Sequence, residues 1–217
     1  MSRSSLSILA FLVLAATGCA AASSTAGVDE GTEVRTAIDR VEVPITLYVV
    51  TDADRGADSR LSSTRTVGDV AAIADLVDAI WRERGVALDV QGVHEIDVPA
   101  DVLLALAQGD TDAFLGAAVD GRFAVPDPSV INGFYVREVG GVNGVAPAGT
   151  RTFFVVDEPT VHDERVTSHE IGHIFGLHHA TEDPDRLMYS GTNGMDITDL
   201  EGAAAVYGAR GMLDGLR

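Results

Sequence analysis

Hydrophobic positions alternate with polar ones in several short runs of the chain. In VEVPITLYVV, residues 41–50, an apolar residue recurs at every second position and β-branched residues are frequent. The alternating residues are Val43, Ile45, Leu47 and Val49. Because successive side chains of a strand point to opposite faces, this run predicts a β-strand. Three further runs predict strands at 86–98, 131–141 and 150–158.

A different spacing appears in TVGDVAAIADLVDAIWRERG, residues 66–85. Its apolar residues Val70, Ile73, Val77 and Ile80 recur every three or four positions, which is the spacing of one helix face. Thr66 and Asp69 form the sequence of a capping box, and Gly85 is a natural stop. A second, shorter helix is predicted at 99–110, with Pro99 at its start. Strand, helix, strand and then two strands before a further helix predict a mixed sheet covered by helices, in an α/β or α+β domain.

The amino-terminal segment differs from the rest of the chain. Residues 1–18 carry Arg3 and then an apolar run that is about half the length needed to cross a bilayer, as in an export signal. AATGC, ending at Cys19, resembles a bacterial lipoprotein signal. This resemblance implies an exported protein that is lipid-anchored at Cys19 in the cell envelope; an ordinary secretion signal is the alternative. Residues 19–40 predict a flexible tether, and 41–217 a single folded domain.

Charge and cysteine content exclude several kinds of partner and site. The 217 residues carry 33 acidic and 15 basic side chains, a formal net charge of −18. Such a surface repels nucleic acid and anionic membranes. We therefore expect no nucleic-acid partner, and we expect contact with a membrane only through the lipid anchor. Cys19 is the only cysteine, which excludes disulfides within the chain and thiolate metal sites in the domain. We expect a monomer.

The chemistry is concentrated in TSHEIGHIFGLHHATEDPDRLMYSG, residues 167–191. His169 and His173 are four residues apart, so on a helix they share one face and can bind one metal ion. Glu170 lies between them, placed to hold a water rather than the metal. Gly176 can adopt the left-handed conformation that ends a helix, and the returning chain then presents a third ligand. His179 suits that role, and its neighbour His178 is the alternative.

The completed pattern H-E-x-x-H-x-x-G-x-x-H resembles the metzincin zinc metallopeptidases. Met188 stands near the position of the methionine in their matrix-metallopeptidase-like (matrixin) branch, and 195–208 is similar to that branch's closing helix. Residues 140–158 resemble the edge strand over the cleft and the strand before the active-site helix. The resemblance implies an α+β zincin-like fold with a mixed, twisted sheet of four to five strands, an active-site helix and a C-terminal helix.

The resemblance also implies roles for individual residues. One catalytic Zn²⁺ would be held by His169, His173 and His179, with Glu170 as general base and Met188 as the apolar floor beneath the ligands. A peptide or protein substrate would pair with the edge strand at Asn143, Gly144, Val145 and Ala146. The sequence departs from relatives at two positions. Ser190 replaces the tyrosine ligand of the astacin-like and serralysin-like members, and Ala180 replaces the serine usual in matrix metallopeptidases.

The sequence thus predicts a zinc-dependent endopeptidase. Two alternatives stay open: a surface lipoprotein that uses this fold to bind a partner, and a zinc hydrolase of a non-peptide amide. Calcium is a further candidate ligand, either in the acidic loop at 52–58 or in the region after the third histidine. The carboxylates of that region are Asp183, Asp185, Asp196 and Asp199.

Overall fold

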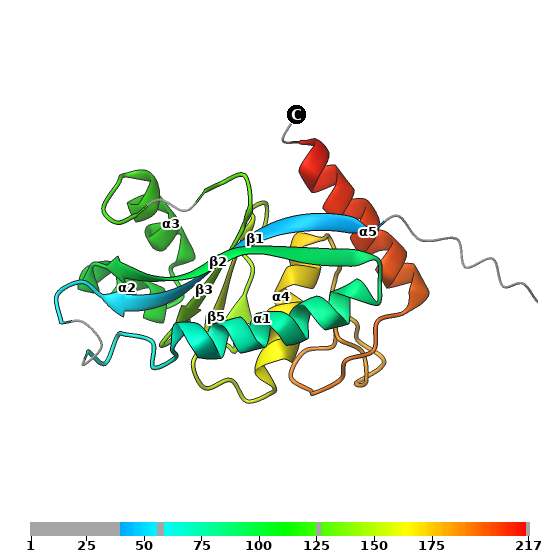
Figure 1. Ribbon diagram of the computed structural model, residues 1–217. Coiled ribbons are helices and arrows are strands. Elements are labelled where there is room, and N and C mark those ends of the chain that lie inside the picture. Colours follow the sequence, from blue (N-terminus) through cyan, green and yellow to red (C-terminus); the bar gives the residue numbers. More distant parts are fainter. Residues whose placement is uncertain (1–39, 56–58, 125–126, 216–217) are drawn as a thin grey trace, which may run out of the picture. The chain divides into compact units, whose positions relative to one another are not determined.

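The computed structural model describes residues 40–55, 59–124 and 127–215, and a five-stranded sheet lies at the centre of this part (Figure 1). The strands are β1 (Val41–Asp52), β2 (Val86–Val98), β3 (Ile131–Val136), β4 (Gly144–Val145) and β5 (Thr152–Val156). They lie in the order β2-β1-β3-β5-β4. β1, β2, β3 and β5 are parallel, whereas the short edge strand β4 is antiparallel to β5. The sheet is therefore mixed.

Helices cover both faces of the sheet. The described residues form α1 (Val67–Arg82), α2 (Ala100–Ala107), α3 (Thr111–Val119), α4 (Asp163–Ile174) and α5 (Asp199–Asp214). One hydrophobic cluster joins α1, α4 and α5 to the face of β1 that carries Ile45 and Leu47. A second cluster joins α2 and α3 to the opposite face through Val50, Phe134 and Phe154. This α+β arrangement with a mixed sheet confirms the predicted fold class.

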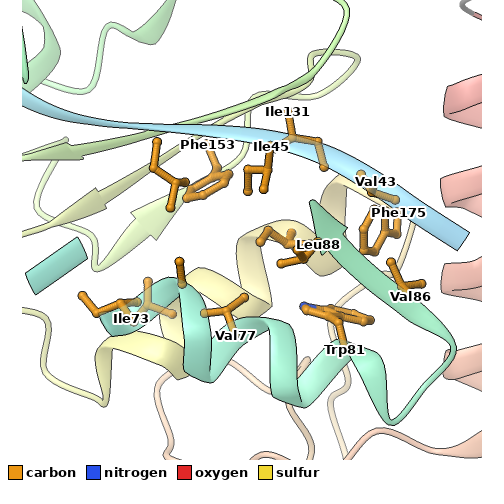
Figure 2. Packing of buried hydrophobic residues seen from close by; sticks show 14 of the residues in the cluster. Val43, Ile45, Ile73, Val77, Trp81, Val86, Leu88, Ile131, Phe153 and Phe175 are labelled. Carbon is orange, nitrogen blue, oxygen red and sulfur yellow. The ribbon is translucent and has the colours of Figure 1, made fainter. Parts of the chain in front are cut away.

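The first cluster holds the site-bearing helix α4 against the sheet. Figure 2 shows Ile73, Val77 and Trp81 of α1 directed toward Ile45 and other strand residues. Phe175, which follows α4, meets Trp81 edge to face, with ring centroids 5.2 Å apart. Each large side chain that is fully buried here stabilises the fold by roughly 1.5–3 kcal/mol. The end of α4 is thus fixed by packing against α1.

The predicted elements agree with the structure over most of their length. The capping box of α1 is confirmed: the Thr66 side chain accepts from Asp69 N, and Thr66 N donates to the Asp69 carboxylate. The predicted strands overlap β1, β2, β3 and β5, and the helix predicted at 99–110 contains α2. The strand predicted at 131–141 ends earlier, since β3 stops at Val136.

Two details of the prediction were wrong or missing. The buried face of α1 continues at Trp81, while Ile80 is only partly buried, because the turn that carries Trp81 faces Phe175. The sequence pattern also missed α3, a short helix capped by Asp110, whose side chain accepts from Ala113 N.

Within the described part of the chain, no helix is long and apolar enough to cross a membrane. Residues 1–39, including Cys19 and the predicted signal, lie outside the described residues, as does nearly all of the tether.

Candidate metal centre

The helix α4 presents the histidine motif. It begins at Asp163, six residues before His169, and Asp163 and Glu164 place negative charge at its amino end, which suits the helix dipole. Arg65 binds both carboxylate oxygens of Asp163, at 2.6 and 2.9 Å. After the helix, Gly176 has φ +87°, and Leu177 N donates back to Gly172 O. The left-handed turn predicted at Gly176 is therefore present, and it returns the chain to the helix.

Three imidazoles converge beyond this turn. His179 Nε2 lies 3.2 Å from His169 Nε2 and 3.1 Å from His173 Nε2. Among the described residues, these three side chains form a group of potential metal ligands whose ligand atoms all lie within 4.8 Å of one another. Two nitrogens bound to one tetrahedral zinc ion, each about 2.05 Å from it, lie about 3.3 Å apart. The spacing therefore fits a single metal ion.

Hydrogen bonds at Nδ1, the ring nitrogen that faces away from the other histidines, fix the tautomers of His169 and His173. His169 Nδ1 donates to Leu187 O at 2.8 Å, and His173 Nδ1 donates to Leu177 O at 2.9 Å. A carbonyl oxygen can only accept, so Nδ1 carries the proton and Nε2 presents a lone pair. Burial lowers the pKa of His169 to about 4 and also lowers the pKa of His173. Both imidazoles are thus neutral at neutral pH, the form that binds a metal.

The structure separates the two candidates for the third ligand. His179 contributes Nε2 to the group of converging nitrogens. His178 is not part of this group, although it lines the same cleft as the three histidines. The backbone holds His179 in place through the next residue, because Ala180 N donates to Met188 O at 2.9 Å. The geometry therefore favours His179.

Glu170 lies on the cleft side of α4, next to the histidines. It is buried, and burial raises its pKa to about 8, although a backbone hydrogen bond from Ala146 and the charge of Arg165 both act to lower it. Gly144 of the edge strand passes close by: a Cβ atom at that position would lie 3.0 Å from Glu170 Cγ and 2.8 Å from Val166 Cγ1. Glycine at 144 therefore lets β4 approach the carboxylate.

A cleft of about 630 Å³ lies between the edge strand and α4. Residues 142–150 line it from one side, and the three histidines, Glu170, His178 and Ser190 are among the residues that line the rest. All four predicted substrate-binding residues line this cleft: Asn143, Gly144, Val145 and Ala146. The Asn143 side chain is held by Thr160, which accepts from Asn143 Nδ2 and donates through its own N–H to Asn143 Oδ1, both at 2.9 Å. The edge strand is thus tied to the loop before α4.

Met188, the predicted apolar floor of the site, is buried with 1% of its surface exposed, and it lies next to α4 at Gly172. A Cβ atom at Gly172 of α4 would lie 2.7 Å from Met188 Sδ, so glycine at 172 makes room for the methionine.

Sequence reasoning missed Arg165, which lies one turn before His169 and also lines the cleft. Its spacing of four residues from His169 was the available signal, since positions four apart share a helix face.

Calcium binding at the acidic positions stays a prediction. Within the described ranges, Asp183, Asp185, Asp196 and Asp199 are not among residues that meet in sets of three or more metal-ligating side chains. Asp58 of the acidic loop lies outside the described residues.

Neither a profile of a known protein family nor a curated protein matches the chain. Among solved structures, the chain is similar to archaemetzincin from Methanopyrus kandleri, with a TM-score of 0.49 and 16% identity, over 83% of this chain and 99% of that one. It is also similar to a chain in a chaperone–substrate complex, with a TM-score of 0.48 and 14% identity. That match covers 81% of this chain but 36% of the other.

Proposed function

We propose that the chain is a zinc-dependent endopeptidase of the metzincin type. The observation that carries the proposal is the convergence of three imidazole Nε2 atoms beside a buried carboxylate, in a cleft below an edge strand. Neutral imidazole is a good ligand for zinc, and the spacing of the nitrogens suits tetrahedral coordination. Assignment to the matrixin branch is also part of the proposal, and it rests on the sequence resemblance at Met188 and 195–208.

The residues of the site have different roles in peptide hydrolysis. His169, His173 and His179 would hold a zinc ion, which would supply a Lewis acid and would lower the pKa of a bound water from about 9 toward 7. In its ionised form, which a nearby Zn²⁺ would favour by lowering its pKa, Glu170 would accept a proton from the attacking water and pass it to the leaving amine, a contribution of about 10²- to 10⁴-fold. The backbone hydrogen bond from Ala146 orients the Glu170 carboxylate for this transfer.

The form of the cleft supports a peptide substrate over a small amide. The cleft continues along residues 142–150 instead of closing around the histidines. An extended peptide can add to the free side of β4, since β4 pairs through its other side with β5. The presence of Glu170 beside the histidines supports catalysis over a role restricted to partner binding.

The test compares the wild-type chain with Glu170→Gln, which keeps the size of the side chain and the three histidines. Both proteins are loaded with zinc, assayed for bound metal and incubated with a mixture of unfolded proteins, and new termini are mapped by mass spectrometry. We expect cleavage by the wild type that falls about 10²- to 10⁴-fold in the variant at equal zinc content. Equal cleavage by both proteins, or none by zinc-loaded wild type, would contradict the proposal.

A further inference from the structure

Arg165 is a buried charge on the same face of α4 as the first two histidines. Only 3% of its surface is exposed, and its Nε atom has no hydrogen-bond partner among the described residues. None of the ion pairs found in the described residues includes it. Burying an arginine with no carboxylate within ion-pair distance is costly, so the bonds that this guanidinium does make are informative.

Those bonds go to the segment that contains Met188. Arg165 Nη2 donates to Leu187 O at 2.8 Å and also to Tyr189 O. The guanidinium therefore binds the carbonyl groups on both sides of Met188, 22 and 24 residues further along the chain. It fixes this segment directly to the helix that carries His169.

The same segment holds two of the three histidines. Leu187 O accepts from Arg165 and also from His169 Nδ1, at 2.8 Å in each case. Met188 O accepts from Ala180 N, next to His179. A shift of residues 187–189 would therefore turn the His169 ring and displace His179 together. Arg165 binds two carbonyl groups of this segment, whereas His169 of the same helix binds one.

We propose that Arg165 is a positioning residue for the metal site: by binding the carbonyl oxygens of Leu187 and Tyr189, it sets the orientation of His169 and the position of His179. This inference rests on the proposed function only in requiring that the three histidines bind a metal ion. Partners behind metal ligands typically change metal affinity by about 10- to 100-fold when they are removed. The effect is thus measurable without a substrate.

The experiment measures Zn²⁺ affinity by competition with a chelator, together with the visible absorption of the Co²⁺-loaded protein. Arg165→Met removes the donors but keeps an apolar chain of similar length. The matched control is Arg151→Met. Arg151 also bonds two backbone carbonyls, Ser129 O and Met212 O at 2.9 Å each, and it is not among the residues that line the cleft. Arg165→Lys retains the charge but cannot reproduce the guanidinium.

We expect Zn²⁺ to bind about 10- to 100-fold more weakly to Arg165→Met, with an altered Co²⁺ spectrum, while Arg151→Met binds as the wild type does. Arg165→Lys should fall between the two, and it carries the test if Arg165→Met does not fold. Wild-type affinity and spectrum in either Arg165 variant would overturn the role of Arg165 alone. An equal loss in Arg151→Met would also overturn it. A wild-type chain that binds no metal would overturn the metal site itself.

Discussion

At the scale of single residues, the candidate site depends on which atom of each side chain faces the metal position. The carbonyl groups of Leu187 and Leu177 accept from Nδ1 of two histidines and leave Nε2 of each directed inward. The Glu170 carboxylate accepts a backbone hydrogen bond from Ala146 and is not part of the group of converging nitrogens. Metal binding and proton transfer are thereby assigned to different side chains.

The adjacent histidines 178 and 179 provide a residue-scale prediction. We expect His179→Ala to weaken Zn²⁺ binding by more than about 100-fold, because it removes one of three ligands. His178→Ala should bind zinc within about threefold of the wild type, because His178 is outside the group of converging nitrogens. Chelator competition on both variants measures the two affinities, and the reverse order would identify His178 as the ligand.

At the scale of elements, the position of α4 depends on close contact with α5. Gly208 of α5 lies against the backbone of Phe175, where α4 ends: a Cβ atom at position 208 would lie 2.7 Å from the carbonyl carbon of Phe175 and would overlap its oxygen. Only glycine permits the two helices to approach this closely. Gly211, one turn later on α5, has open space around the same position.

These two glycines give a matched pair of substitutions. Gly208→Ala should lower the free energy of unfolding by about 1–3 kcal/mol, because the added methyl group has to push the backbone of Phe175 away. Gly211→Ala should leave it unchanged or raise it by up to about 1 kcal/mol, since alanine favours the helix and meets nothing. Urea denaturation followed by circular dichroism measures both changes. A Gly208→Ala protein as stable as Gly211→Ala would contradict the contact.

The start of α5 predicts a pH dependence. Burial alone would raise the pKa of Glu201, but hydrogen bonds from Arg186 and Thr198 outweigh burial and hold that pKa below its ordinary value of 4.5. A carboxylate with a lowered pKa in the folded state stabilises the fold above its unfolded pKa, and this contribution is lost as the pH falls through the folded pKa.

We therefore expect Glu201→Gln to reduce the free energy of unfolding by about 1 kcal/mol near pH 6, and by progressively less as the pH falls below 4.5. Urea denaturation of the wild type and the variant between pH 6 and pH 3 measures this difference directly. A difference that is constant across the range, or that grows at low pH, would contradict the ionised pair with Arg186.

At the scale of the whole molecule, the site joins segments that are distant in sequence. The edge strand β4, helix α4 and the loop at 177–191 all line one cleft, and α1 and α5 support α4 from the first hydrophobic cluster. A ligand that binds the three histidines therefore links segments that must all be in place. Binding only to the folded state stabilises the fold by mass action.

Metal addition and removal test this linkage. With free Zn²⁺ at about 100 times its dissociation constant, the folded state should gain about 2.7 kcal/mol, which corresponds to a rise in Tm of about 5–10 °C. A chelator should reverse the rise. His169→Ala should show no zinc-dependent change in Tm, because it lacks one ligand. Thermal unfolding of both proteins with and without zinc measures the effect, and an unchanged wild-type Tm would contradict metal binding to the folded state.

The sequence by itself determined the features that depend on near neighbours. The alternation at 41–50, the capping box at Thr66 and the histidine spacing each involve residues within one strand, one helix or one turn, where local geometry decides which side chains share a face. The resemblance to metzincins then implied Met188 and the edge strand. Together these features were sufficient to predict the fold class and to place Glu170 and the three histidines at one site.

Only the tertiary structure decided how the site is supported. Arg165 reaches carbonyl groups 22 and 24 residues away, and glycines at 144 and 172 leave room for Glu170 and Met188. These contacts join segments whose separation along the chain says nothing about their distance in space. The short helix α3 and the burial of Trp81 in place of Ile80 likewise depend on packing against other elements, which local periodicity does not encode.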